Sequence, residues 1–483
     1  MKKTPAPKTL SSLERVSVGQ KLAYGTGNLA TMIGKQAPKT FSYQIYNIEL
    51  GVISPIMIGN VIFLSRLIDA IANPIMGDIS DKSTHRWGRR RPYLLLGSLL
   101  SALCFAALWM IPRGLSDTGY LLYFGALSIL FYLALTVYTV PWYALGYELT
   151  TDYHERTRVM AYPSFVAPFA AILVGWMYNI TYWDIFADRI EAIRWVGSLT
   201  AFAMLAAGLV SACFTDEPLH TAKAAAPPPN AKPVSAKKAQ RSGLFTNIKQ
   251  SLACKPFRML SLTIACILLG SNMIRGLESY VTVYYLYGGE KEPASALLAW
   301  HSTVSTILTL AIIPVITQLA TRYGKQRILA ASLYLALAGT LAKLVLYTPA
   351  WPYLSLVVSI MVAPAMASVF MLVQAMVADV CDLDELQYHH RREGMFGAVY
   401  AFLFKTGISI AFLCSGYVIA STGFSQEIGG PQSESTLQGL RLLFAFIPAL
   451  AFAVGIYFIH QYDLDEKQVR HIRDQLDARK LAL

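Results

Sequence analysis

Long apolar segments alternate with short polar ones along most of the chain. Each apolar segment has about 20 residues or more, which is the length that a helix needs to cross the hydrocarbon core of a bilayer. The first segment is the least apolar of them. The pattern predicts an all-α membrane protein with twelve transmembrane helices, approximately at residues 22–47, 54–79, 93–112, 120–148, 159–180, 194–214, 259–287, 295–319, 328–347, 352–380, 395–422 and 439–461.

One polar stretch divides these twelve segments into six and six. Residues 222–242 read AKAAAPPPNAKPVSAKKAQRS, a composition that is typical of linkers and cannot bury a core. We therefore expect four parts. They are an N-terminal six-helix bundle (1–218), a cytoplasmic linker (219–258), a C-terminal six-helix bundle (259–462) and a cytoplasmic tail (463–483).

A short basic motif occurs at matching positions in the two halves. The chain reads Arg86-Trp-Gly-Arg-Arg-Arg91 after the second predicted span and Arg322-Tyr-Gly-Lys-Gln-Arg327 after the eighth. Two repeated sets of six helices are the layout of transporters that rock around a central site. The motif therefore favours two pseudo-symmetric bundles over twelve unrelated helices.

Composition and charge support a membrane protein and give it an orientation. The chain is 55% hydrophobic and 14% charged, so a soluble globular protein is excluded. Its formal charge of +12 indicates no nucleic-acid partner, because there is no soluble basic face. Most Lys and Arg residues fall in the two termini and in the loops after even-numbered spans. By the positive-inside rule, both termini and the linker are expected on the cytoplasmic side of the membrane. The membrane itself is expected to be a cell inner membrane. The opposite side carries only Arg113, Arg189, Arg194, Lys291 and Arg441.

Residues that commonly carry catalysis or bind metals do not form recognisable sets. The six cysteines contain no C-x-x-C pair, and His389-His390 lacks spaced partners for a metal. The sequence has no phosphate-binding loop and no nucleophile elbow. We therefore expect no disulfide framework, no metal, no cofactor and no enzymatic activity.

Three stretches resemble a known family. GDISDKSTHRWGRRRP (77–92) is similar to the loop between helices 2 and 3 of the major facilitator superfamily. LSRLIDAIANPIMGDISD (64–81) and MVADVCDLDELQYHHRREGMFGAVYAFLFKTG (376–407) resemble the glycoside–pentoside–hexuronide:cation symporters within it. The resemblance implies the major facilitator fold and transport by alternating access, by a chain that functions as a monomer.

Ionisable residues inside spans are costly and usually functional. Arg66, Asp69 and Asn73 share one face of the second span. The resemblance implies that Asp69 binds the coupling cation, aided by Thr136 and Lys405. Some family members have a second acidic residue where this chain has Asn73, which leaves H⁺ and Na⁺ both open. The alternative is a structural salt bridge between Asp69 and Arg66 or Lys405.

The expected solute site is rich in cations and aromatic rings. Lys35 and Lys39 lie one turn apart on the first span, and Arg275 and Glu278 lie on the seventh. Thr139 and Tyr143 replace sugar-binding residues of galactoside-transporting members, so that galactoside site is not retained. An excess of cations favours an anionic solute such as a uronate, although the charges could instead pair internally. The expected solute-binding residues are Lys35, Lys39, Arg66, Thr139, Trp142, Tyr143, Arg275 and Glu278.

Charged residues also gather at the cytoplasmic ends of the predicted helices. Exposed charge pairs are worth about 0–1 kcal/mol each, so they can hold two bundles closed and still release them. The alternative is that they are topology signals and solvated charges. The predicted gate comprises Asp81, Arg86, Arg89, Arg90, Arg91, Glu155, Arg158, Asp382, Arg391, Arg392 and Glu393.

Together these features predict a secondary active transporter. It would move a small polar solute, a glycoside or an acidic sugar, together with H⁺ or Na⁺ across the bilayer. A lysolipid or another organic anion is the alternative cargo, and an uncoupled facilitator is the alternative mechanism. A membrane enzyme or receptor would need a catalytic cluster or a sensory domain, and the sequence contains neither.

Overall fold

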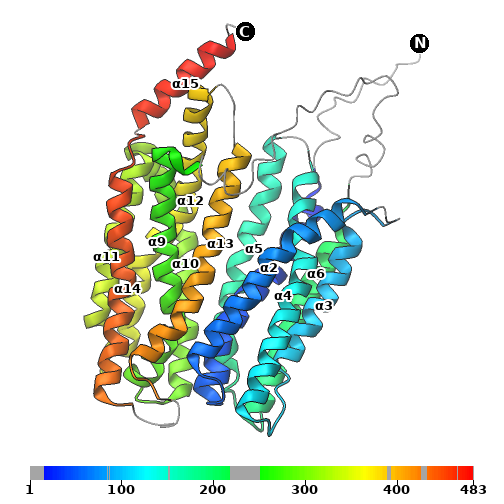
Figure 1. The fold of residues 1–483 in the computed structure, drawn as a ribbon, viewed down its shortest axis with the longest axis vertical. Coiled ribbons are helices and arrows are strands. Elements are labelled where there is room, and N and C mark those ends of the chain that lie inside the picture. Colours follow the sequence, from blue (N-terminus) through cyan, green and yellow to red (C-terminus); the bar gives the residue numbers. More distant parts are fainter. Residues whose placement is uncertain are drawn as a thin grey trace, which may run out of the picture. The chain divides into compact units, whose positions relative to one another are not determined.

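A computed structural model describes residues 16–83, 85, 87–150, 153–217, 251–388, 393–425, 432–464 and 466–481. Regular structure within these ranges is entirely helical, as Figure 1 shows. The first six helices are α1 (Val18–Ser42), α2 (Pro55–Asp81), α3 (Arg91–Trp109), α4 (Asp117–Glu148), α5 (Tyr153–Ile180) and α6 (Arg189–Phe214). The corresponding helices of the second half are α9 (Lys255–Tyr280), α10 (Lys291–Tyr323), α11 (Lys325–Leu346), α12 (Leu356–Tyr388), α13 (Glu393–Ser421) and α14 (Glu434–His460).

Each of the twelve predicted spans coincides with one of these helices. Eleven helices in the described part of the chain are long and apolar enough to cross a membrane. The remaining helix, α1, is more polar than the others, since it contains Lys21, Lys35 and Lys39 together with several uncharged polar residues and glycines. The predicted all-α membrane fold is confirmed, including its least apolar member.

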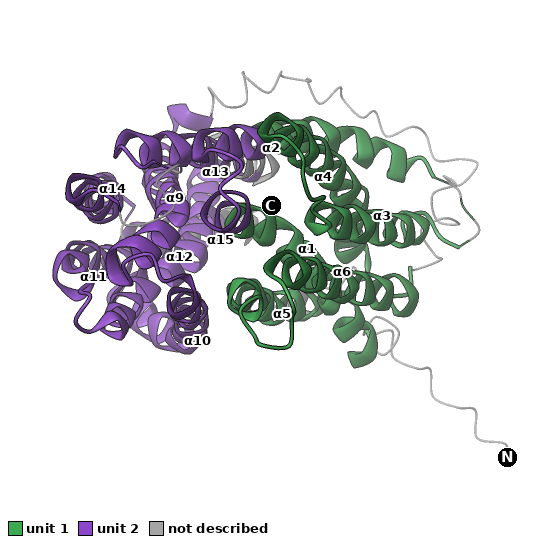
Figure 2. Ribbon diagram, turned by 90° about the horizontal axis from the view of Figure 1, so that it is seen from below, with its two compact units in different colours: residues 1–42, 64–234 green, residues 43–63, 235–483 purple. Residues whose placement is uncertain are grey.

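The chain divides into two compact units, which Figure 2 colours separately. Unit 1 comprises residues 1–42 and 64–234, and unit 2 comprises 43–63 and 235–483. In unit 1, α3 packs against α4 and α6, and α1 packs against α5 and α6. In unit 2, α11 packs against α12 and α14, and α9 packs against α13 and α14. Counted from the start of each half, these are the same four pairs, so the internal repeat extends from a short motif to helix packing.

Residues 43–63 belong to unit 2 although they follow α1 directly. The α1 helix continues as a π-helical turn, η2 (Tyr43–Glu49), and its repeat partner α9 continues as a similar turn, η3 (Val281–Leu286). Tyr280 donates a 2.5 Å hydrogen bond to Asn47 Oδ1, and Gln44 Nε2 lies 3.3 Å from Ser279 Oγ. These buried polar contacts fasten the start of the α1–α2 connection to α9. Nothing in the hydropathy pattern indicated this attachment.

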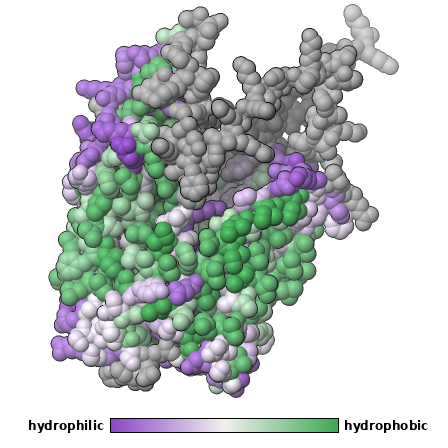
Figure 3. Space-filling model, viewed as in Figure 1, coloured by the Kyte–Doolittle hydropathy of each residue, from purple (hydrophilic) through white to green (hydrophobic). Residues whose placement is uncertain are grey.

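A further helix, α15 (Glu466–Leu481), occupies the segment that was expected to be a tail. It packs against α12 and buries Ile472 and Leu476 in the apolar core of unit 2. Along the middle of the helices, apolar side chains cover the surface, and polar ones gather toward the ends, as Figure 3 shows for one face. Leu122, Phe202 and Val345 are among the exposed apolar side chains, and such side chains suit contact with lipid.

Candidate functional site

The centre of the candidate cation site is a carboxylate on α2 that faces a hydroxyl on α4. Asp69 Oδ1 lies 2.5 Å from Thr136 Oγ1, and the same hydroxyl lies 2.9 Å from the carbonyl oxygen of Tyr132. A hydroxyl has one hydrogen and can donate it to only one acceptor at a time. When Tyr132 takes it, the oxygens of Asp69 and Thr136 face each other and are suited to share a proton or a hard cation.

Arg66 lies one turn before Asp69 but does not pair with it. Its Nη2 donates to the carbonyl of Lys35 over 3.0 Å, and its guanidinium lies 5.0 Å from the centre of the Tyr132 ring. Its Nε is buried and has no hydrogen-bond partner among the described residues. Among the described residues of unit 1, the Asp69 carboxylate therefore forms no ion pair and contacts the Thr136 hydroxyl. Asn73 is half-buried on the same helix, and Lys405 is exposed on α13 of unit 2.

Lys35 on α1 and Tyr143 on α4, two of the residues expected to bind the solute, contact each other. The Lys35 ammonium donates to the Tyr143 hydroxyl over 2.9 Å and lies 4.9 Å from its ring centre. Tyr143 is 37% exposed, whereas Trp142 is 1% exposed and donates its indole N–H to Tyr24 O. The Trp142 ring also stacks on Tyr24 and meets the Tyr143 ring edge-on. Trp142 therefore supports Tyr143 from within the bundle rather than presenting its own surface.

The other expected solute-binding residues are distributed over both units. Thr139 is buried on α4, and Lys39 is half-buried on α1. In unit 2, Arg275 is exposed and Glu278 is half-buried, both on α9. Glu278 interacts electrostatically with Arg275 and also with Lys343, a buried lysine on α11. Each unit thus contributes at least two cations within its spans.

The predicted gate residues of the α2–α3 loop are bonded inside unit 1. Arg90 lies 2.5 Å from Glu148 at the end of α4 and 2.9 Å from Asp81, and Arg89 also contacts Glu148 at 2.5 Å. Burial alone would lower the pKa of the Arg90 guanidinium, but hydrogen bonds and charges of Glu148 and Asp81 raise it above its ordinary value. Arg91 donates to the carbonyls of the last turn of α6. These contacts fasten the loop to its own unit. The gate between the two bundles stays a prediction.

Unit 2 contains the repeat-related version of this ion pair. Lys325 occupies the motif position of Arg89 and lies 2.5 Å from Asp379 near the end of α12. The glycines before them, Gly88 and Gly324, have φ angles of 105° and 91°, a backbone conformation that favours glycine. Sequence reasoning missed Lys325 and Asp379 as ion-pair partners, although the alignment of the two motifs indicated where to look.

Glu155 at the start of α5 is also a buried gate residue. It lies 2.5 Å from the ammonium of Lys21 and 3.4 Å from Arg158, and it accepts a hydrogen bond from the backbone N–H of Val16. Asp382 is buried on α12. The predicted residues Arg86, Arg391 and Arg392 lie outside the described residues, as does the side chain of Glu393.

The pairing of Glu155 predicts a loss of stability in acid. The hydrogen bond from Lys21 lowers the pKa of Glu155 below its ordinary value. A carboxyl group with a lowered pKa stabilises the fold above its unfolded pKa of about 4.3 and loses this effect as pH falls through the folded value. We expect Glu155→Gln to lower the melting temperature at neutral pH and to make little difference in strong acid. Thermal unfolding of the unmodified protein and of Glu155→Gln, from strong acid to neutral pH, checks this prediction. An equal difference in melting temperature at every pH would contradict it.

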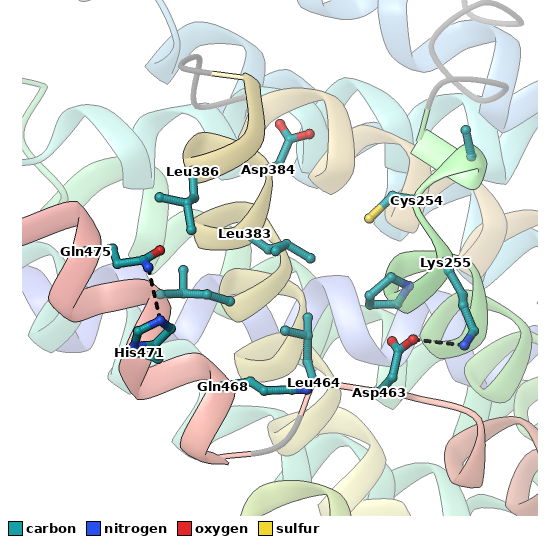
Figure 4. A pocket seen from close by; sticks show the side chains of 13 residues that line it. Cys254, Lys255, Leu383, Asp384, Leu386, Asp463, Leu464, Gln468, His471 and Gln475 are labelled. Atoms are coloured by element: carbon teal, nitrogen blue, oxygen red, sulfur yellow. Dashed lines mark hydrogen bonds and ion pairs between the residues drawn. The ribbon is translucent and has the colours of Figure 1, made fainter. Parts of the chain in front are cut away.

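A cavity of about 550 Å³ opens in unit 2 between the start of α9, the end of α12 and α15 (Figure 4). Lys255 and Asp463 form an ion pair of 2.8 Å at one side, and His471 contacts Gln475 at the other. None of the predicted site residues that the structure describes lines it. The cavity therefore belongs to the attachment of α15 and is separate from the candidate site.

Comparison with known proteins decides the family. The family model described as "MFS/sugar transport protein" matches residues 23–466, which include both units and every described residue of the candidate site. The chain belongs to this family. Its members are transporters rather than enzymes, in agreement with the expectation from the sequence.

Three relatives of this MFS/sugar transport protein are similar over nearly its whole length. A putative glycoside/cation symporter of Escherichia coli is 23% identical, with 97% of each chain covered. A glucuronide carrier protein homolog of E. coli is 21% identical, with 95% of each covered. The sodium-dependent lysophosphatidylcholine symporter 1 of Mus musculus is 24% identical, covering 99% of this chain and 90% of its own.

A solved structure supports the fold. The crystal structure of a D-xylose–proton symporter superimposes with a TM-score of 0.63 at 13% identity, covering 93% of this chain and 98% of the other. At this identity the likeness concerns the fold alone. It agrees with the two repeated six-helix sets, so the major facilitator fold predicted from the sequence is confirmed.

Proposed function

We propose that this protein is a cation-coupled symporter of a small acidic sugar such as a uronate. The cation, H⁺ or Na⁺, binds at Asp69 and Thr136, and the acid group of the solute is bound by lysine and arginine side chains within the spans. Both termini lie in the cytoplasm. The two six-helix bundles rock about a central site to expose it to either side of the membrane in turn.

The observation that carries the cation site is the unpaired state of Asp69. No arginine or lysine nitrogen of unit 1 lies within 4 Å of its carboxylate among the described residues, and its nearest polar partner is the Thr136 hydroxyl. An intramembrane carboxylate that lacks a fixed counter-ion is costly, and a bound cation or proton removes this cost. Solute movement is then coupled to the ion, because the negative charge of Asp69 is neutralised only when the ion is bound.

The choice of an acidic solute comes from the balance of charges. Among the described residues of unit 1, Lys35 contacts an uncharged tyrosine, and Arg66 contacts a backbone carbonyl and a ring. Neither forms an ion pair among the described residues of unit 1. Cations that lack fixed carboxylate partners can bind an anion with charge-assisted hydrogen bonds. The E. coli relative named as a glucuronide carrier homolog supports this solute class.

A lysolipid is the second candidate cargo, because one relative is named as a lysophosphatidylcholine symporter. A sugar-sized acid is favoured by the hydroxyl and ammonium that Tyr143 and Lys35 present together. Competition distinguishes the two cargos. If lysophosphatidylcholine blocks the counterflow of glucuronate at equal concentration, while a neutral glucoside and galacturonate do not, this result would favour the lipid as cargo.

Lys35→Gln tests the solute class. We expect the apparent KM for glucuronate counterflow to rise about 10–100-fold, because a charge-assisted hydrogen bond contributes about 1.5–3 kcal/mol. Transport of a neutral glucoside should change far less. Lys82→Gln is the matched control, since Lys82 forms an exposed pair with Asp78. Equal loss for acidic and neutral solutes, or no loss for either, would argue against an acid-binding role for Lys35.

A further inference from the structure

Arg66 on α2 stands beside the candidate cation site and also contacts the lysine proposed to bind the solute. Its Nη2 donates to the main-chain carbonyl of Lys35 on α1 over 3.0 Å. The ammonium of the same lysine donates to the Tyr143 hydroxyl over 2.9 Å. Asp69 follows Arg66 by three residues on α2, so these two side chains are neighbours on the helix surface. One arginine therefore lies next to both proposed sites.

Residues of α4 join Arg66 and Asp69 in one cluster. The Arg66 guanidinium lies 5.0 Å from the centre of the Tyr132 ring, within the range of a cation–π contact. Tyr132 interacts electrostatically with Asp69 as well as with Arg66. The Thr136 hydroxyl, which contacts Asp69, lies 2.9 Å from the carbonyl oxygen of Tyr132. A change of charge at Asp69 is therefore felt directly by the guanidinium.

Arg66 has a donor to spare for a second acceptor. Its Nε is buried and has no hydrogen-bond partner among the described residues, and an unused buried donor favours any acceptor within reach. The Asp69 carboxylate is such an acceptor, because side chains three residues apart on a helix meet. Arg66 thus has two alternative acceptors, and the structure shows it on the Lys35 carbonyl.

The charge of Asp69 biases the choice between these acceptors. A negative carboxylate attracts the guanidinium away from the Lys35 carbonyl, because hydrogen bonds between two charged groups are the stronger ones. A carboxylate neutralised by a cation no longer competes. The helix that carries both residues can adjust, since among the described residues α2 packs closely against no other helix. Lys35 is therefore held more firmly when the charge of Asp69 is neutralised.

We propose that Arg66 is a positioning residue that transmits the charge of Asp69 to Lys35. Neutralisation of Asp69 leaves the guanidinium on the Lys35 carbonyl, which fixes the lysine beside Tyr143 for the acid group of the solute. The inference rests on the proposed function for the roles of Asp69 and Lys35, and it adds the link between them. By reciprocity, bound solute favours the ion-bound state of Asp69 to the same degree.

Acetylation of Lys35 tests this link without solute and without a choice of coupling ion. The full-length protein in lipid nanodiscs, in choline chloride at about pH 8, reacts with limiting acetic anhydride, and peptide mass spectrometry gives the rate at each lysine. Asp69→Asn represents the neutralised state. Lys82, which is exposed just after α2, is the internal reference in every sample. The Lys35 rate is compared in the unmodified protein, Asp69→Asn, Arg66→Gln and the double variant.

We expect Asp69→Asn to slow the acetylation of Lys35 about fivefold, the lower end of couplings between two sites. In the Arg66→Gln background, Asp69→Asn should have no effect, because the link is missing. Arg113→Gln, which removes an exposed arginine of the same unit, should leave the effect of Asp69→Asn intact. If Arg66→Gln fails to fold, Arg66→Lys should reduce the effect to less than about twofold, since an ammonium lacks the planar fork.

Two results overturn the proposal. One is an effect of Asp69→Asn that persists in full without Arg66, and the other is the absence of any effect on Lys35 in the first place. A purely structural Arg66 would change the Lys35 rate equally with and without the charge of Asp69. Failure of glucuronate transport leaves these rates unaffected, so the proposed function and this link fail separately.

Discussion

Replacement of Asp69 by Asn is expected to abolish accumulation of the solute while preserving its exchange. The substitution keeps the shape and the hydrogen bond to Thr136 but removes the charge that a cation neutralises. A tenfold accumulation corresponds to about 1.4 kcal/mol of work, which an uncoupled carrier cannot supply. In proteoliposomes with an imposed cation gradient, the ratio of solute inside to outside should fall to about one, whereas counterflow should continue.

The matched control for Asp69→Asn lies on the same helix. Asp78 is exposed, and its ion pair with Lys82 is solvated, so Asp78→Asn should accumulate solute as the unmodified protein does. Full accumulation by Asp69→Asn would remove this carboxylate from coupling. Loss of both accumulation and counterflow would instead indicate that the residue holds the fold.

Replacement of Arg90 by Gln is expected to cause the largest loss of stability. Arg90 is 4% exposed and contacts both Glu148 and Asp81, so its removal leaves two carboxylates near each other at the end of the bundle. Breaking a buried pair costs about 3–5 kcal/mol. Arg89 still contacts Glu148, so we expect about 2–4 kcal/mol and a fall in melting temperature of roughly 5–10 °C.

An exposed arginine provides the comparison for Arg90→Gln. Arg113 pairs with Asp188 at the surface of unit 1, where ion pairs contribute about 0–1 kcal/mol. Arg113→Gln should therefore unfold within about 2 °C of the unmodified protein. A shift for Arg90→Gln no larger than that of Arg113→Gln would contradict a fastening role for the loop contacts.

The fold was predictable from the sequence because a bilayer imposes one pattern. Every spanning helix needs about 20 apolar residues, so even α1, which carries three lysines, was found between polar boundaries. The repeat was visible in one motif, and helix packing extends it to whole units. Hydropathy could not indicate that residues 43–63 belong to unit 2. That assignment depends on the hydrogen bonds of Asn47 and Gln44 with α9.

The candidate site was predictable in part, for chemical reasons. Asp69 was conspicuous as a carboxylate in a span, and the family resemblance supplied Thr136 as its partner. Spacing along one helix also suggested Arg66 as a partner of Asp69, yet its guanidinium bonds to the Lys35 carbonyl on α1 instead. Glu148 was missed because it stands at a helix end, where a charge is common.

We propose that a cation gradient drives the movement of the solute. Purified protein in proteoliposomes is given an inward gradient of Na⁺ or of H⁺, separately, with labelled glucuronate outside and no other energy source. We expect one of the two gradients to raise internal glucuronate several-fold above the external concentration, and an ionophore that collapses the gradient to release it. Equilibration to equal concentrations under both gradients, with normal counterflow, would contradict it.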